Sequence, residues 1–201
     1  MSDVETRCLV LPDAEVRMAE RDGRPMIVGR AIRYGSLSRE LRSDRGRFRE
    51  RFAPGAFTRS LQSGADVRAL INHDKNLVMG RNVAGTLRLF DDPDELRFEI
   101  DPPDTTWSRD YLVSIARGDM GGVSFRFYKR RDDWERDPAD GVEIRTVTEA
   151  AIDDVSIVTY PAYEDTSAAL RSLDEFRRSQ PAGTPLRARA ARLTRLAEAD
   201  S

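Results

Sequence analysis

Apolar and polar residues alternate along the middle of the chain, which is the pattern of strands that bury one face. The clearest example is the segment 121–128, where Val123, Phe125 and Phe127 alternate with more polar side chains. The same reasoning predicts strands at 26–34, 66–73, 85–90, 96–100, 142–147 and 152–159. A charged segment with proline and glycine, 130–141, is predicted to be the tip of a hairpin.

Helical patterns are short and lie between or after these strands. The segment 52–57 leads into a short helix that ends near Gly64, and a third helix is predicted at 165–178. Thr105 or Thr106 is suited to cap a helix over 107–117, which Gly118 stops. Helices that flank or interrupt a strand-rich centre predict an α+β fold, either a compact β-barrel or a strongly bent, mostly antiparallel sheet with peripheral helices.

The composition divides the chain into three parts. Residues 1–25 are polar and predict an N-terminal arm or an edge strand, whereas residues 26–178 hold the strongly patterned segments and predict one domain. Residues 179–201 predict a linker, rich in proline and glycine at 180–185, and a basic tail. The arginines of that tail are typical of a solvated helix face; a docking or packaging tail is the alternative.

Charge and rare residues remove several classes of function. The net charge is −2 in 201 residues, so nothing points to a nucleic-acid or membrane partner. Cys8 and His73 are the only cysteine and histidine, which excludes an intrachain disulfide and a zinc site built from such ligands. The sequence has no glycine-rich nucleotide loop, so no cofactor is expected. It also lacks a secretion signal or a membrane-spanning run, and we expect a soluble protein in a reducing interior.

Hydrolysis by serine, histidine and a carboxylate survives these exclusions, and His73 is its only histidine base. His73 ends a predicted strand, in the sequence Leu-Ile-Asn-His-Asp, where a base is firmly held yet open to substrate. Strand alternation, however, places His73 on the apolar face of Val67, Ala69 and Ile71. The pattern alone therefore favours a half-buried core histidine.

Ser124 is the best nucleophile by pattern. Alternation sends it to the face opposite Val123 and Phe125, and Gly121 and Gly122 before it leave room for a substrate. A serine on the solvent face of a strand is nevertheless ordinary, so this pattern alone does not assign a role.

The carboxylate candidates lie in the strand predicted at 152–159. Asp154 shares its more polar face with Ser156, so it can point toward the same surface as Ser124. Asp153 points the other way, which also makes Asp153 and Asp154 a poor acid–base pair for a carboxylate-based hydrolase. Asp74 follows His73 directly and is a poor partner for it, because adjacent strand side chains point to opposite faces.

Six segments in the same order resemble the prohead maturation serine proteases of tailed phages, which are related in fold to herpesvirus assembly proteases. The segments are Gly-Arg-Ala-Ile at 29–32, Phe-Ala-Pro-Gly-Ala-Phe at 52–57, Val-Arg-Ala-Leu-Ile-Asn-His-Asp at 67–74, Gly-Arg at 80–81 with Gly-Thr-Leu at 85–87, Gly-Val-Ser-Phe-Arg-Phe at 122–127, and Asp-Val-Ser-Ile-Val-Thr-Tyr-Pro-Ala-Tyr at 154–163. Each is weak alone, but their order over about residues 26–170 is specific.

The resemblance implies site roles: Ser124 as nucleophile, His73 as general base and Asp154 as the residue that orients the histidine. Herpesvirus proteases use a second histidine, which this chain lacks, and phage members usually carry glutamate where Asp154 stands. Aspartate is one methylene shorter than glutamate, so its carboxylate extends less far toward the imidazole. Ser156 is a secondary nucleophile candidate.

The resemblance further implies a serine endopeptidase that cuts the major capsid protein or a scaffold protein, and commonly itself, inside the prohead in the host cytoplasm. The linker and tail at 180–201 would then be a scaffold-binding or self-cleaved extension. Related viral proteases often dimerise, so the resemblance also implies a homodimer or a higher oligomer. No stripe of residues in the sequence marks an interface. The alternative function is a non-catalytic capsid-assembly or scaffold protein that retains the protease fold.

Overall fold

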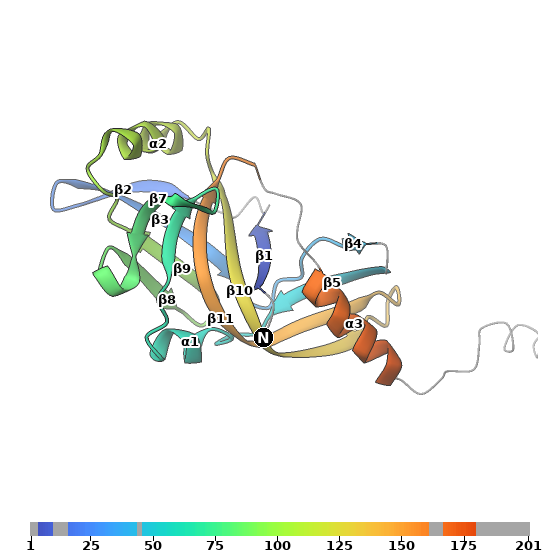
Figure 1. The fold of residues 1–201 in the computed structure, drawn as a ribbon. Helices are drawn as coiled ribbons and strands as arrows, with labels where there is room; N and C mark the ends of the chain where they lie inside the picture. The colour runs from blue at the N-terminus through green and yellow to red at the C-terminus, as the bar shows by residue number, and fades with distance from the viewer. Residues whose placement is uncertain (1–3, 10–15, 44–45, 161–166, 180–201) are drawn as a thin grey trace, which may run out of the picture. The chain divides into compact units, whose positions relative to one another are not determined.

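Two sheets and a few short helices make up the protein (Figure 1). The computed structural model describes residues 4–9, 16–43, 46–160 and 167–179. The chain separates into two compact units, Met1–Ala168 and Ala169–Ser201, and both sheets belong to the first. The predicted α+β class is confirmed: strands dominate, and the larger sheet curls into a half-barrel.

The larger sheet is built around two long strands, β10 and β11. Its path runs in the order β1 (Val4–Leu9), β10 (Gly122–Arg136), β11 (Glu143–Val158), β5 (Gly46–Phe52) and β4 (Leu41–Ser43). The first half of β11 pairs in parallel with β5, and its second half pairs in parallel with β6 (Arg68–Ile71). β6 in turn forms a hairpin with β7 (Asp74–Arg81).

The β10–β11 hairpin corrects two sequence predictions. The segment 130–136, predicted as part of the hairpin tip, continues β10, and the two strands predicted at 142–147 and 152–159 are one continuous strand. Register shifts interrupt the ladder between Arg126 and Phe127 and again between Lys129 and Asp132. Such bulges change the phase of alternation, so the sequence pattern suggests breaks where the strands continue.

The smaller sheet is antiparallel throughout. Its order is β2 (Arg17–Arg21), β3 (Arg24–Arg33), β9 (Glu95–Ile100) and β8 (Leu87–Asp91). Buried side chains from both sheets form one apolar core, which includes Ile27, Phe98 and Val155. Phe52 packs edge-on against Phe125 and Phe127, with ring centroids 5.5 and 5.2 Å apart. The core therefore fixes the inner face of β10.

The helices agree with the sequence predictions. α1 (Thr58–Gln62) follows β5, a 3-10 turn spans Asn82–Ala84, and α3 (Ser167–Ser179) belongs mainly to the second unit. α2 (Thr106–Ala116) is capped by Thr105, whose Oγ1 accepts a hydrogen bond from the Ser108 amide at 3.4 Å. No helix in the described parts of the chain is long and apolar enough to cross a membrane.

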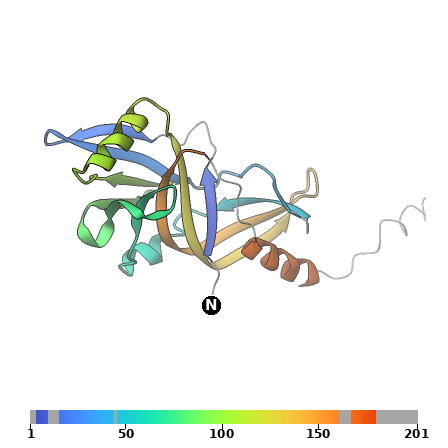
Figure 2. The ribbon, with the colours of Figure 1, turned by 45° about the horizontal axis from the view of Figure 1, so that its top comes forward.

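Both ends of the sequence include residues outside the described ranges. Within the segment 1–25, which was predicted to be an arm or an edge strand, β1 and β2 are edge strands of the two sheets. Figure 2 shows β1 running beside β10, in agreement with Figure 1. The predicted linker and basic tail at 180–201 lie outside the described residues.

Gly80 in β7 is a position where the chain passes close to its neighbours. A Cβ atom there would lie 2.7 Å from the carbonyl oxygen of Thr86 and 3.1 Å from Cγ2 of Ile100. Because a backbone oxygen cannot yield like a flexible side chain, we expect Gly80→Ala to destabilise the fold by about 1–3 kcal/mol. This corresponds to a fall in Tm of roughly 2–10 °C, measurable by circular dichroism.

Gly121→Ala is the matched control, since a Cβ at Gly121 would meet nothing within 4 Å. Equal losses of Tm in the two variants would contradict the close approach at Gly80.

Candidate active site

His73 lies in a two-residue turn between β6 and β7, not at the end of a strand. Asn72 and His73 both have left-handed backbone conformations, with φ of 50° and 58°. Two successive residues of this kind form the tight hairpin turn that matches the twist of the strands it joins. The prediction that His73 alternates with Val67, Ala69 and Ile71 on a strand face is therefore wrong: β6 ends at Ile71, and the turn redirects the imidazole.

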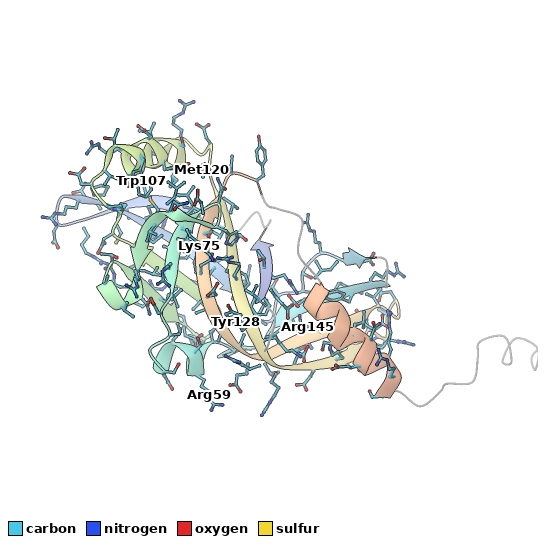
Figure 3. The ribbon with its side chains drawn as sticks, viewed as in Figure 1. Arg59, Lys75, Trp107, Met120, Tyr128 and Arg145 are labelled. Atoms are coloured by element: carbon cyan, nitrogen blue, oxygen red, sulfur yellow. The ribbon has the colours of Figure 1, made fainter. Side chains whose placement is uncertain are left out.

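Contacts with the end of β11 hold this turn in place. The Asn72 amide donates to the Ile157 carbonyl at 3.0 Å, and the Thr159 amide donates to Asn72 Oδ1 at 3.0 Å. The segment after the turn, predicted as a loop as far as Gly80, is instead β7, and Figure 3 labels Lys75 near its start. His73 is therefore fixed by backbone pairing on both sides of the turn.

The structure brings Ser124 to this imidazole. Ser124 stands on β10 directly opposite Ser156 of β11, and its Oγ lies 2.6 Å from Nε2 of His73. As predicted, Val123 and Phe125 face the core, while Ser124 faces the other way. The unexpected feature is burial: the exposed fraction of Ser124 is 0%.

Asp154 completes a continuous chain of hydrogen bonds. Its Oδ1 lies 2.7 Å from Nδ1 of His73, so the shorter aspartate side chain does reach the ring. A bulge follows this position in the ladder: Arg126 pairs with Asp154 and Phe127 with Ile152, which leaves Asp153 as the extra residue of β11. Before the bulge the ladder is regular, with Ser124 opposite Ser156 and Arg126 opposite Asp154, so Asp154 lies on the same side of the sheet as Ser124.

Two further side chains hold the Asp154 carboxylate, and their roles were not predicted from the sequence. Arg126 Nε donates to Oδ2, while the Ser156 hydroxyl donates to Oδ1 at 2.8 Å and lies 3.0 Å from Nδ1 of His73. The sequence could have indicated these roles, because Arg126 shares the polar face of β10 with Ser124, and Ser156 shares the polar face of β11 with Asp154. Ser156 meets the ring nitrogen that faces the carboxylate, not the one that faces Ser124.

Asp154 carries its negative charge at neutral pH. Burial raises the pKa of this carboxyl, but hydrogen bonding and charge from His73, followed by hydrogen bonds from Ser156 and Arg126, outweigh burial and lower the pKa below its ordinary value. An ionised carboxylate next to Nδ1 favours the ring tautomer that carries its proton on Nδ1. Nε2 is then free to accept the proton of Ser124.

The other carboxylate candidates lie elsewhere. Asp153 is more exposed than Asp154 and lies 3.7 Å from Arg126 Nε. Asp74 accepts a hydrogen bond from the Asn76 amide at 2.8 Å, within the start of β7. Among the described residues, the carboxylate that contacts His73 is that of Asp154, so the arrangement does not support an Asp153–Asp154 acid–base pair.

The N-terminal strand β1 covers the serine. β1 pairs with β10 over six residues, and Cys8, in the segment predicted to be an arm or an edge strand, is the backbone partner of Ser124. The carbonyl oxygen of Arg7 lies 3.1 Å from Ser124 Oγ. The single hydroxyl proton of Ser124 can go to this carbonyl or to His73, but not to both. β1 thus covers Ser124 along the edge of β10, and its Arg7 carbonyl contacts the serine hydroxyl.

Comparisons with known proteins identify the family of this chain. The sequence matches the family described as caudovirus prohead serine protease over residues 12–179. A solved structure of the capsid assembly protease gp21 of bacteriophage T4 aligns with a TM-score of 0.49 and 11% identity, covering 79% of this chain and 98% of that one. No curated protein sequence is significantly similar to the chain. Because the family match spans most of the sequence, the chain belongs to the caudovirus prohead serine proteases.

Proposed function

We propose that this protein is a serine endopeptidase that cuts the capsid protein or a scaffold protein, and its own chain, during prohead maturation in the infected cell. The observation that carries the proposal is the unbroken hydrogen-bond chain from Ser124 through His73 to Asp154. Membership of the prohead protease family supplies the substrate class.

In this mechanism, Ser124 Oγ attacks the scissile carbonyl carbon while its proton passes to Nε2 of His73. The imidazolium that forms is stabilised by the Asp154 carboxylate, which Arg126 and Ser156 hold in position. His73 then gives the proton to the leaving amine, and an acyl-enzyme on Ser124 remains. Water, deprotonated by the same nitrogen, hydrolyses the acyl-enzyme and restores the serine.

The burial of the hydrogen bonds from Ser124 through His73 to Asp154 favours efficient proton transfer. The side chain of Asp154 is 2% exposed and that of His73 18%. Little water therefore competes for the ring nitrogens, and the charge interaction between carboxylate and imidazolium is screened less than it would be at the surface.

Ser124→Ala tests the nucleophile, with Ser156→Ala as its matched control. Both serines contact His73, but Ser156 contacts Nδ1, which takes no proton from the nucleophile. We expect co-expression with the capsid protein to give a shortened capsid band with the wild type, a weaker one with Ser156→Ala, in which Asp154 loses one hydrogen bond, and none with Ser124→Ala.

Identical processing by the wild type and Ser124→Ala would remove Ser124 from the mechanism. An intact capsid protein with every form of the enzyme would instead favour a non-catalytic assembly protein.

Asp154→Asn tests the orienting carboxylate. An amide at this position can donate a hydrogen bond to Nδ1, which stabilises the tautomer with its proton on Nε2, the wrong nitrogen for a base. We expect the rate of capsid cleavage to fall by about 10³- to 10⁴-fold, measured from the appearance of the shortened band with time.

Asp153→Asn removes the neighbouring charge outside the hydrogen-bond chain and should keep cleavage within about threefold of the wild type. Equal losses in the two variants would show that general charge near Arg126, not the contact with His73, is what matters.

A further inference from the structure

The side of β1 that faces away from Ser124 carries a buried network of charges. Glu5 and Arg7 alternate with half-buried Val4 and Thr6, and the side chains of Glu5 and Arg7 are 1% and 4% exposed. They meet Glu50 of β5 and Arg145 of β11, which are themselves adjacent in the parallel ladder. Figure 3 labels Arg145 on β11. β1 is thus bound through these charge pairs and a backbone ladder.

Each charged side chain of β1 has an opposite charge on the domain. Arg7 donates to both carboxylate oxygens of Glu50, from Nε at 2.5 Å and from Nη2 at 3.0 Å. Arg145 donates to both oxygens of Glu5, from Nη1 at 2.6 Å and from Nη2 at 2.9 Å. Contacts of two donors with two acceptors are directional and select a particular side chain.

The charges left on the domain stay partnered without β1. Arg145 also contacts Glu50 at 2.8 Å and Asp132 at 2.7 Å. Glu5 and Arg7 neutralise each other, with Oε2 and Nη2 2.7 Å apart. An isolated buried charge would be prohibitively costly. Exchange of β1 for another strand avoids this cost, because it leaves no charge buried without an opposite charge.

A substrate needs the place that β1 occupies. Ser124 is fully buried, and the Arg7 carbonyl is in contact with its hydroxyl. A peptide that takes the place of β1 along this edge of β10 brings one of its carbonyl groups to Ser124, as Arg7 does. Extended peptides commonly bind to sheet edges in this way, with the ladder giving affinity and alternate side chains giving specificity.

We infer that Glu50 and Arg145 are specificity-determining residues that select substrates containing Glu-x-Arg, with the arginine at the residue whose carbonyl faces Ser124. β1, with the sequence Glu5-Thr6-Arg7, occupies this site in the structure as a mimic of such a segment. Glu50 receives the arginine, and Arg145 receives the glutamate two residues before it. The inference rests on the proposed function, because it assumes that Ser124 marks the bond to be cut.

The first test measures binding without catalysis. The full-length Ser124→Ala chain, with Glu5→Ala and Arg7→Ala added to weaken the hold on β1, is titrated with two fluorescent peptides. One is Val-Glu-Thr-Arg-Ser-Leu-Val; its matched control, Val-Arg-Thr-Glu-Ser-Leu-Val, has the same composition and net charge. We expect at least tenfold tighter binding of the first in fluorescence anisotropy. Equal affinities in a chain that keeps its circular dichroism spectrum would overturn the inference.

The second test measures cleavage by the Glu5→Ala/Arg7→Ala chain with Ser124 intact. We expect a kcat/KM at least tenfold higher for the Glu-x-Arg peptide and a cut after its arginine, identified by mass spectrometry. A third peptide carries glutamine in place of the arginine. When Glu50→Gln is added to the Glu5→Ala/Arg7→Ala chain, we expect most of the preference for the arginine peptide over the glutamine peptide to be lost.

The two tests separate the two proposals. Equal cleavage of both peptides overturns the specificity and leaves the serine protease in place. A binding preference with no cleavage by any chain that retains Ser124 supports the recognition site and overturns the protease function.

Discussion

The parallel pairing of β6 with the second half of β11 is the contact on which the site depends. β10, which carries Ser124, pairs with one edge of β11, and β6 pairs with the other. A residue that follows β6 therefore reaches Ser124 only across β11. The left-handed turn at Asn72 and His73 carries the imidazole in that direction, and Asp154 and Ser156 of β11 contact its ring. His73 thus comes from the turn after β6, and Asp154 and Ser124 come from the neighbouring strands β11 and β10.

Much of this arrangement was predictable from alternation, and the exceptions have physical causes. The faces of β10 follow from Val123, Phe125 and Phe127, because no bulge interrupts 122–126. The turn at His73 was missed because Ala69 and Ile71 before it suggest a strand that continues. The residue types could have indicated this turn, since asparagine and histidine adopt the left-handed backbone conformation more readily than most residues.

The edge strand β1 marks the limit of reasoning from hydrophobic pattern. Its inward side chains are Glu5 and Arg7, so its alternation predicts a solvated segment when the strand is considered alone. Their burial depends on Glu50 and Arg145, which are distant in sequence and lie in strands whose other inward residues are largely apolar. Charge complementarity between such segments becomes visible only when the fold brings them together.

The apolar core positions both polar clusters, the one around His73 and the charge network of β1. Phe125 and Phe127 anchor the inner face of β10, and the Arg7 guanidinium lies 5.6 Å from the centre of the Phe127 ring. Ser124 and Arg126, which alternate with these residues in sequence, contact His73 and Asp154 respectively. Because desolvation offsets most of the attraction in buried ion pairs, the charges add selectivity and geometry more than stability. The rigidity of β10 comes from its aromatic face, and this leaves the side chains on its polar face and the strand at its edge available for recognition and chemistry.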